Sequence, residues 1–191
     1  MIDLFREAAT LQSLLENEGK SFFFLGGIAL QRWGQPRLTT DIDLTVFTDL
    51  RDETAQMQWF MAHFRPRGMS AENAIEFAQT SRVLLLEAAS GIPIDLMLGG
   101  LSDTSSDLER ATYERFTPTI SLKVCSAESL IAFKIVAGRP QDMADLESVI
   151  IKQSELDWAY IWQYLEQVNE YQDISVRISN LKLLKEQYYR P

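Results

Sequence analysis

Two aspartates interrupt a stretch of sequence that otherwise favours a β-strand. Asp41 and Asp43 flank Ile42, and the apolar and β-branched run Leu44 to Phe47 follows directly. Asp is a poor strand former, because its carboxylate competes for backbone hydrogen bonds and gains little from packing on a pleated surface. The fold around this segment must therefore supply something that compensates for two carboxylates.

Alternation along the strand divides its side chains between two faces. The face expected to join the core carries Ile42, Leu44 and Val46. The opposite face carries both aspartates, together with Thr39, Thr45 and Phe47. Residues two apart in a strand have Cα atoms about 6.5 to 7 Å apart, so the two carboxylates can share a cation. Mg²⁺ prefers oxygen ligands and suits such a pair, whereas a solvent-facing strand with an acidic outer face is the alternative.

A glycine pair precedes this strand. Gly26 and Gly27 end the apolar run Ser21 to Leu25 and lead into Ile28 to Trp33, which has helical character. This order predicts a tight turn from a strand into a helix. Unpaired backbone N–H groups and the positive end of the helix dipole attract phosphate there, and glycine allows close approach. An ordinary strand-to-helix turn is the alternative.

A third isolated aspartate, Asp95, lies in the apolar segment Ile92 to Leu98. This segment and Val83 to Ala88 predict a hairpin around Gly91. Pro93 has no N–H to donate, so we expect this strand to lie at an edge of the sheet or to lack one ladder bond there. The alternative is that Asp95 faces solvent on an edge strand and has no role in a site.

The remaining segments predict helices and one loop. Helical spacing of apolar residues extends over Asp3 to Leu15 and Glu53 to Phe64, and Gly99 to Ser106 has loop composition. Beyond about Cys125 the chain becomes helical, with one capping arrangement expected at Ser154 and Asp157. We expect two parts, a core over residues 1–121 and a helical lobe over residues 122–191.

Ser126 is a good N-cap for the first helix of the lobe, which contains Lys134. An ammonium group in mostly apolar surroundings usually extends to the surface, which is one interpretation of this lysine. Gly138 and a proline then break the helix, and Asp142 and Asp145 share one face of the next. Asp142 is also a candidate cap of that helix.

Composition and charge limit the classes of function. The chain has 191 residues, 46% of them hydrophobic, which is enough for one substantial core. The single Cys125 excludes an intrachain disulfide, and no segment has the pattern of a membrane span or signal peptide, so we expect a cytoplasmic protein without a membrane partner. The formal net charge of −9 argues against broad nucleic-acid binding. The candidates for a local basic groove are Arg32, Arg37, Arg65, Arg67 and Arg82. His63, the only histidine, excludes a His-rich metal site.

Together these motifs resemble a known family. Leu25-Gly26-Gly27, then Arg37-x-Thr39-x-Asp41-Ile42-Asp43-Leu44, then the lone Asp95 are similar to the nucleotidyltransferase superfamily that includes DNA polymerase beta. Within it the chain most resembles the AbiEii-type branch, the nucleotidyltransferase toxins of type IV toxin–antitoxin systems. The helix with Lys134, followed by Arg139, Asp142 and Asp145, resembles a third family element. Many superfamily members have a serine where this chain has Ile28.

The resemblance implies an α+β nucleotidyltransferase fold, a small mixed sheet flanked by helices, with a C-terminal helical lobe. It implies that Asp41 and Asp43 bind one or two Mg²⁺ ions and that Asp95 is the third carboxylate. It also implies nucleotide contacts, through Gly26, Gly27, Arg37, Thr39 and Lys134. Arg37 and Thr39 would orient either the triphosphate or the strand that carries the aspartates.

The function implied is magnesium-dependent transfer of a nucleoside monophosphate (NMP) from a nucleoside triphosphate (NTP) to an acceptor hydroxyl, with release of pyrophosphate. By resemblance, the acceptor is the end of a tRNA or a protein side chain, and a cognate antitoxin is an expected partner. An aminoglycoside-like small molecule is a further acceptor class. The rival hypothesis is a non-catalytic module of the same fold that neutralises a partner protein or senses a nucleotide. The sequence does not indicate an oligomeric state.

Overall fold

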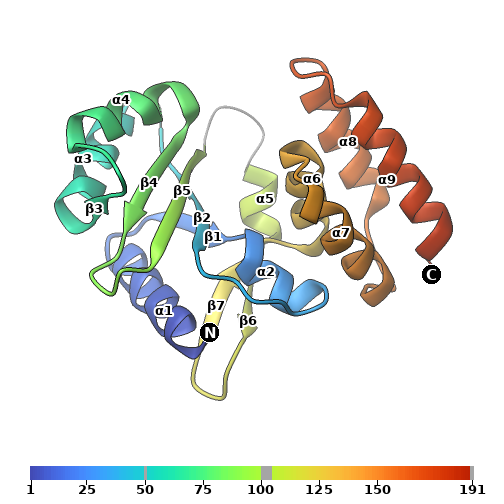
Figure 1. The fold of residues 1–191 in the computed structure, drawn as a ribbon, viewed down its shortest axis with the longest axis horizontal. Helices are drawn as coiled ribbons and strands as arrows, with labels where there is room; N and C mark the ends of the chain where they lie inside the picture. Colours follow the sequence, from blue (N-terminus) through green and yellow to red (C-terminus); the bar gives the residue numbers. More distant parts are fainter. Residues whose placement is uncertain (50, 100–104, 190–191) are drawn as a thin grey trace. The chain divides into compact units, whose positions relative to one another are not determined.

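A computed structural model describes residues 1–49, 51–99 and 105–189 (Figure 1). The chain forms two compact units. The first comprises Met1–Ile28 and Leu38–Cys125, and the second comprises Ala29–Arg37 and Ser126–Pro191. Of the predicted loop Gly99 to Ser106, residues 100–104 lie outside the described part of the chain.

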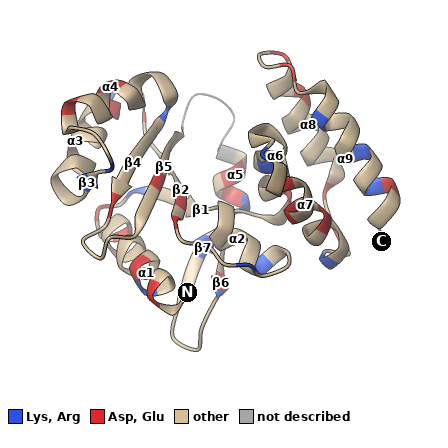
Figure 2. Ribbon diagram, viewed as in Figure 1, with Lys and Arg blue, Asp and Glu red and all other residues tan. Residues whose placement is uncertain are grey.

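The first unit is built on a mixed sheet with strand order β3-β4-β5-β2-β1-β7-β6 among the described residues. The strands are β1 (Ser21–Phe24), β2 (Ile42–Phe47), β3 (Arg65–Pro66), β4 (Val83–Glu87), β5 (Pro93–Gly99), β6 (Thr112–Arg115) and β7 (Ser121–Val124). The pairs β2–β5 and β1–β7 are parallel, and the other neighbours are antiparallel. Acidic positions lie on both β2 and β5, which are adjacent strands (Figure 2).

Helices accompany the sheet and make up the second unit. The first unit contains α1 (Ile2–Asn17), α3 (Glu53–His63), α4 (Ala71–Ser81), α5 (Ser105–Arg110) and the start of α2 (Gly26–Trp33). The second contains the rest of α2 with α6 (Ala127–Ala137), α7 (Pro140–Lys152), α8 (Trp158–Asn169) and α9 (Ser175–Tyr188). The predicted α+β class, a mixed sheet flanked by helices with C-terminal helices, is confirmed. No helix within the described ranges is both long and apolar enough to cross a bilayer.

The alternation predicted for β2 is present. Ile42, Leu44 and Val46 are fully buried, as the core face requires. The neighbouring β1 contributes Phe22 to Phe24, which are also buried. Burial of these side chains removes a large apolar area from water, so the centre of the sheet is well anchored.

Two local predictions were right only in part. The strand that begins at Pro93 does not lie at an edge, because β5 pairs with β4 on one side and β2 on the other. Proline is tolerated because it is the first residue of that strand. The cap of α8 is Asp157 alone, whose carboxylate accepts from the Tyr160 N–H at 3.1 Å, whereas Ser154 lies outside the helix.

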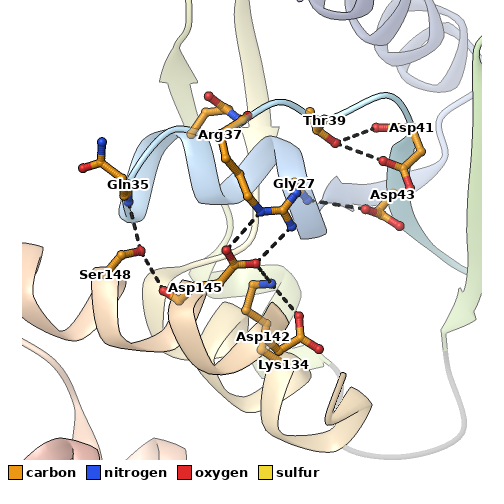
Figure 3. Close-up of polar contacts among 11 residues, drawn as sticks. Gly27, Gln35, Arg37, Thr39, Asp41, Asp43, Lys134, Asp142, Asp145 and Ser148 are labelled. Atoms are coloured by element: carbon orange, nitrogen blue, oxygen red, sulfur yellow. Dashed lines mark hydrogen bonds and ion pairs between the residues drawn. The ribbon is translucent and has the colours of Figure 1, made fainter. Parts of the chain in front are cut away.

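A largely buried ion cluster connects α6, α7 and the segment before β2 within the second unit (Figure 3). The Lys134 side chain is only 7% exposed and donates to Asp142 Oδ1 at 2.8 Å and Asp145 Oδ2 at 2.6 Å. Arg37 donates to Asp145 through Nε and Nη2, both at 3.0 Å. The lysine therefore does not extend to the surface, because two carboxylates of α7 compensate for its burial.

Asp142 also serves the start of α7. Its Oδ2 accepts from the Arg139 N–H at 3.0 Å, which satisfies a donor that the first helical turn leaves unpaired. The predicted capping role of Asp142 is thus confirmed, and the same carboxylate binds Lys134 through its other oxygen.

We predict that Asp145→Asn destabilises the protein at neutral pH by about 3 kcal/mol, because it removes the carboxylate that the buried Lys134 and the partly buried Arg37 share. Burial alone would raise the pKa of Asp145, but hydrogen bonds and charges from Arg37 and Lys134 lower the pKa below its usual value. This stabilisation is therefore complete above the unfolded pKa of about 3.9 and is lost as pH falls through the folded-state pKa.

Urea unfolding of both proteins between pH 3 and pH 7 tests this prediction. The difference between wild type and Asp145→Asn should shrink toward the acidic end, and Glu155→Gln, at an exposed position of the same unit, should match wild type throughout. A difference that stays constant with pH would refute the assigned role of the carboxylate charge.

Candidate active site

Three carboxylates converge on one face of the sheet. Asp43 of β2 and Asp95 of β5 are direct partners in the parallel register, so their side chains share a face. Asp41 lies at the bend immediately before β2. One oxygen of each carboxylate lies within 4.8 Å of the others, and all three residues are half-buried. The sheet therefore brings together the three aspartates that the sequence singled out.

The donor set fits a divalent cation. All three ligands are hard carboxylate oxygens, the type that Mg²⁺ and Ca²⁺ prefer. Oxygens of one Mg²⁺ ion lie up to about 4.2 Å apart, twice the Mg–O distance, so small side-chain adjustments would allow shared coordination. Without a cation, three negative charges this close would repel one another. A bound cation would supply the compensation that aspartates in an apolar strand require.

The glycine pair makes room for this strand. Gly26 has a φ of +57°, and a Cβ on it would lie 1.9 Å from Asp43 Oδ2. A Cβ on Gly27 would lie 2.2 Å from Thr39 Oγ1. The Gly27 N–H points toward Asp43 Oδ2 at a long 3.4 Å (Figure 3). Close approach of the start of α2 to the aspartate strand therefore explains both glycines, and contact with phosphate remains a prediction.

Thr39 orients one of the carboxylates. Its hydroxyl donates to Asp41 Oδ1 at 3.0 Å, and the residue is only 5% exposed. Of its two predicted roles, this contact favours orienting the aspartates over orienting the triphosphate. Ile28, at the position where many superfamily members have serine, is fully buried and belongs to the core.

Arg37 and Lys134, the other predicted nucleotide contacts, belong to the second unit. Both side chains bind Asp145 there (Figure 3). Their predicted contact with a triphosphate is not tested by this arrangement. The role of Asp145 as their common partner was not predicted, because it depends on how α6, α7 and the segment before β2 pack together.

One contact to the three aspartates was missed by sequence reasoning. Arg67 Nη2 donates to Asp95 Oδ1 at 2.5 Å. The sequence placed this arginine only in a general basic set. Two other members of that set also form ion pairs in the first unit, Arg65 with Glu87 and Arg82 with Glu53. Much of the proposed basic groove is therefore committed to carboxylates.

Residues 10–189 match the family model of the nucleotidyl transferase AbiEii toxin, type IV TA (toxin–antitoxin) system. No curated protein matches the sequence.

Two of the solved structures that share this fold illustrate the similarity. An antigenic nucleotidyltransferase-like protein from Paracoccidioides brasiliensis is 21% identical with a TM-score of 0.53, and the alignment covers 94% of this chain and 92% of that one. The antibiotic-resistance factor ANT(2'')-Ia is 14% identical with a TM-score of 0.55, and the alignment covers 96% of both chains. At these identities the similarity establishes a nucleotidyltransferase fold, and the family match over nearly the whole sequence is more specific. The chain belongs to the AbiEii nucleotidyltransferase toxin family of type IV toxin–antitoxin systems.

Proposed function

We propose that this protein transfers an NMP from an NTP to an acceptor hydroxyl in a magnesium-dependent reaction. The observation that carries the proposal is the convergence of Asp41, Asp43 and Asp95 within 4.8 Å on one face of the sheet. Membership of a nucleotidyltransferase family supports the same reaction class. Intact carboxylates at all three positions argue against the non-catalytic alternative.

In the proposed reaction the acceptor oxygen attacks the α-phosphorus. The new P–O bond forms as the bond from the α-phosphorus to the bridging oxygen breaks, and pyrophosphate leaves. Asp41 and Asp43 would hold one or two Mg²⁺ ions, and Asp95 would complete the ligand set or accept the proton of the hydroxyl. When bound, Mg²⁺ stabilises the charge of the leaving group and lowers the pKa of the attacking hydroxyl.

The residues around the aspartates have supporting roles in this proposal. Thr39 holds the carboxylate of Asp41 in place through its hydroxyl. Gly26 and Gly27 keep the start of α2 close to Asp43, and the N–H groups of this first turn would face the β- and γ-phosphates. Arg37 and Lys134 are proposed triphosphate contacts on the basis of the family alone.

The acceptor is proposed as the end of a tRNA or a protein side chain, in keeping with the toxin family, and a cognate antitoxin is the expected protein partner. A net charge of −9 disfavours extended contacts with RNA, so a tRNA would be held near its end rather than along its length. A small-molecule acceptor is the outcome to expect if neither macromolecule is modified.

We predict that Asp43→Asn lowers transfer by about three orders of magnitude, because losing a metal ligand removes several kcal/mol of transition-state stabilisation. The assay incubates the protein with Mg²⁺, each α-labelled NTP in turn and total tRNA, and separates the products on a denaturing gel. Label on RNA identifies a tRNA acceptor, and label on protein identifies a side chain.

Asp49→Asn is the matched control, since it makes the same substitution at an exposed residue just beyond β2. This variant should transfer like wild type. If Asp43→Asn kept full activity while folded, the metal-ligand assignment would be wrong. Absence of label in wild type, with NTP binding intact, would favour a small-molecule acceptor or the non-catalytic module.

We predict that Gly26→Ala displaces the Asp43 carboxylate and weakens both Mn²⁺ binding and transfer, because the added Cβ would overlap Oδ2. Gly19→Ala separates this effect from backbone strain, since Gly19 has a similar φ of +63° but no heavy atom within 4 Å of the added Cβ. Both variants should lose about 1 kcal/mol of stability from the left-handed backbone. Only the first should lose metal binding, measured by Mn²⁺ titration; equal binding in both would contradict the steric explanation.

A further inference from the structure

A basic side chain and two carboxylates line up across four neighbouring strands. Arg67 directly follows β3, and its N–H donates to the Leu85 carbonyl of β4 at 2.8 Å. Leu85 pairs with Asp95 of β5, and Asp95 pairs with Asp43 of β2. Because directly paired residues share a face of the sheet, the strand pairing places Arg67 two strands from Asp95, across β4, in the row that contains the three aspartates.

The side chain of Arg67 reaches across the sheet and contacts the carboxylate of Asp95. Its Nη2 lies 2.5 Å from Asp95 Oδ1, a short, charge-assisted hydrogen bond. Both side chains keep about a third of their surface exposed, 31% for Arg67 and 28% for Asp95. The pair is thus fixed by backbone register yet open to solvent, so the guanidinium can leave Asp95 without unfolding the sheet.

Charge determines what this contact does. Three carboxylates carry three negative charges, and the guanidinium, which does not lose its proton in proteins, adds one fixed positive charge beside them. This charge relieves the repulsion among the aspartates in the absence of metal. It also repels a free divalent cation, while it attracts a metal–triphosphate complex, whose net charge is negative.

We propose that Arg67 is the resident counter-ion of the three aspartates. It binds Asp95 in the free protein, opposes binding of a divalent cation alone, and moves to the anionic triphosphate when the metal–nucleotide complex enters. The site therefore prefers metal with nucleotide over metal alone. This inference rests on the proposed function, since it needs the three aspartates to bind a cation.

Variants at two neighbouring arginines test the proposal. Arg67→Gln removes the positive charge at Asp95, and Arg67→Lys keeps it. Arg65→Gln is the matched control, because it changes the net charge equally on the same short segment. Arg65 pairs with Glu87, which lies opposite Pro93, two residues from Asp95.

The first measurement is Mn²⁺ binding without nucleotide, followed by the electron paramagnetic resonance signal of the free ion. Arg67→Gln should bind Mn²⁺ about tenfold more tightly than wild type, since a unit charge about 6 Å from a divalent ion has roughly that effect in water-like surroundings. Arg67→Lys and Arg65→Gln should stay within about twofold of wild type, and the gain in Arg67→Gln should shrink as salt is added.

The second measurement is binding of Mn²⁺ with α,β-methylene-ATP, which is resistant to transfer. Arg67→Gln should bind this complex more weakly than wild type, so its two affinities should change in opposite directions. A merely structural role would weaken both. Circular dichroism confirms that each variant is folded. If the glutamine variant is not folded, Arg67→Ala removes the same charge and replaces it in both measurements.

Equal or weaker Mn²⁺ binding in Arg67→Gln, with wild type binding normally and Asp43→Asn not binding, would overturn the counter-ion role and leave the metal site intact. If neither wild type nor Arg67→Gln binds Mn²⁺ in either measurement, the metal site itself fails and the role of Arg67 fails with it.

Discussion

The parallel register between β2 and β5 is the constraint on which the rest of the site depends. It sets Asp43 directly opposite Asp95 and keeps both carboxylates on the face away from Ile42 and Leu44, which are buried in the core. A slip of one residue would turn one aspartate into the core, where an unpaired charge is very costly. Packing of the apolar face therefore holds the acidic face in place.

Residues from neighbouring segments lie close to the three aspartates that this register positions. The glycines at the start of α2 leave no side chain between that helix and Asp43, Thr39 holds Asp41, and Arg67 offsets the charge of Asp95. These contacts come from three different parts of the first unit. Each limits the freedom of one carboxylate, so the three aspartates would need little side-chain rearrangement to share a cation.

Much of this could be predicted from the sequence, because the signals are local. The alternation along β2, the hairpin around Gly91 and the cap at Ser126 follow from neighbouring residues. What could not be predicted depends on pairing between distant strands and helices. Lys134 is buried because Asp142 and Asp145 reach it from the next helix, and Arg67 contacts Asp95 only through the order β3-β4-β5. The edge position expected for the strand of Pro93 was wrong for the same reason. Whether a strand lies at an edge depends on the strand order of the whole sheet, and Pro93 begins an interior strand.

The most direct test of this account is a crystal of the protein soaked in Mn²⁺ with a non-hydrolysable NTP and measured for anomalous scattering. One or two anomalous peaks are expected within coordination distance of Asp41, Asp43 and Asp95, and these peaks should be absent from crystals of Asp43→Asn. Bound nucleotide with no anomalous peak at these carboxylates, or with the peak held by other residues, would contradict the claim that they form the metal site.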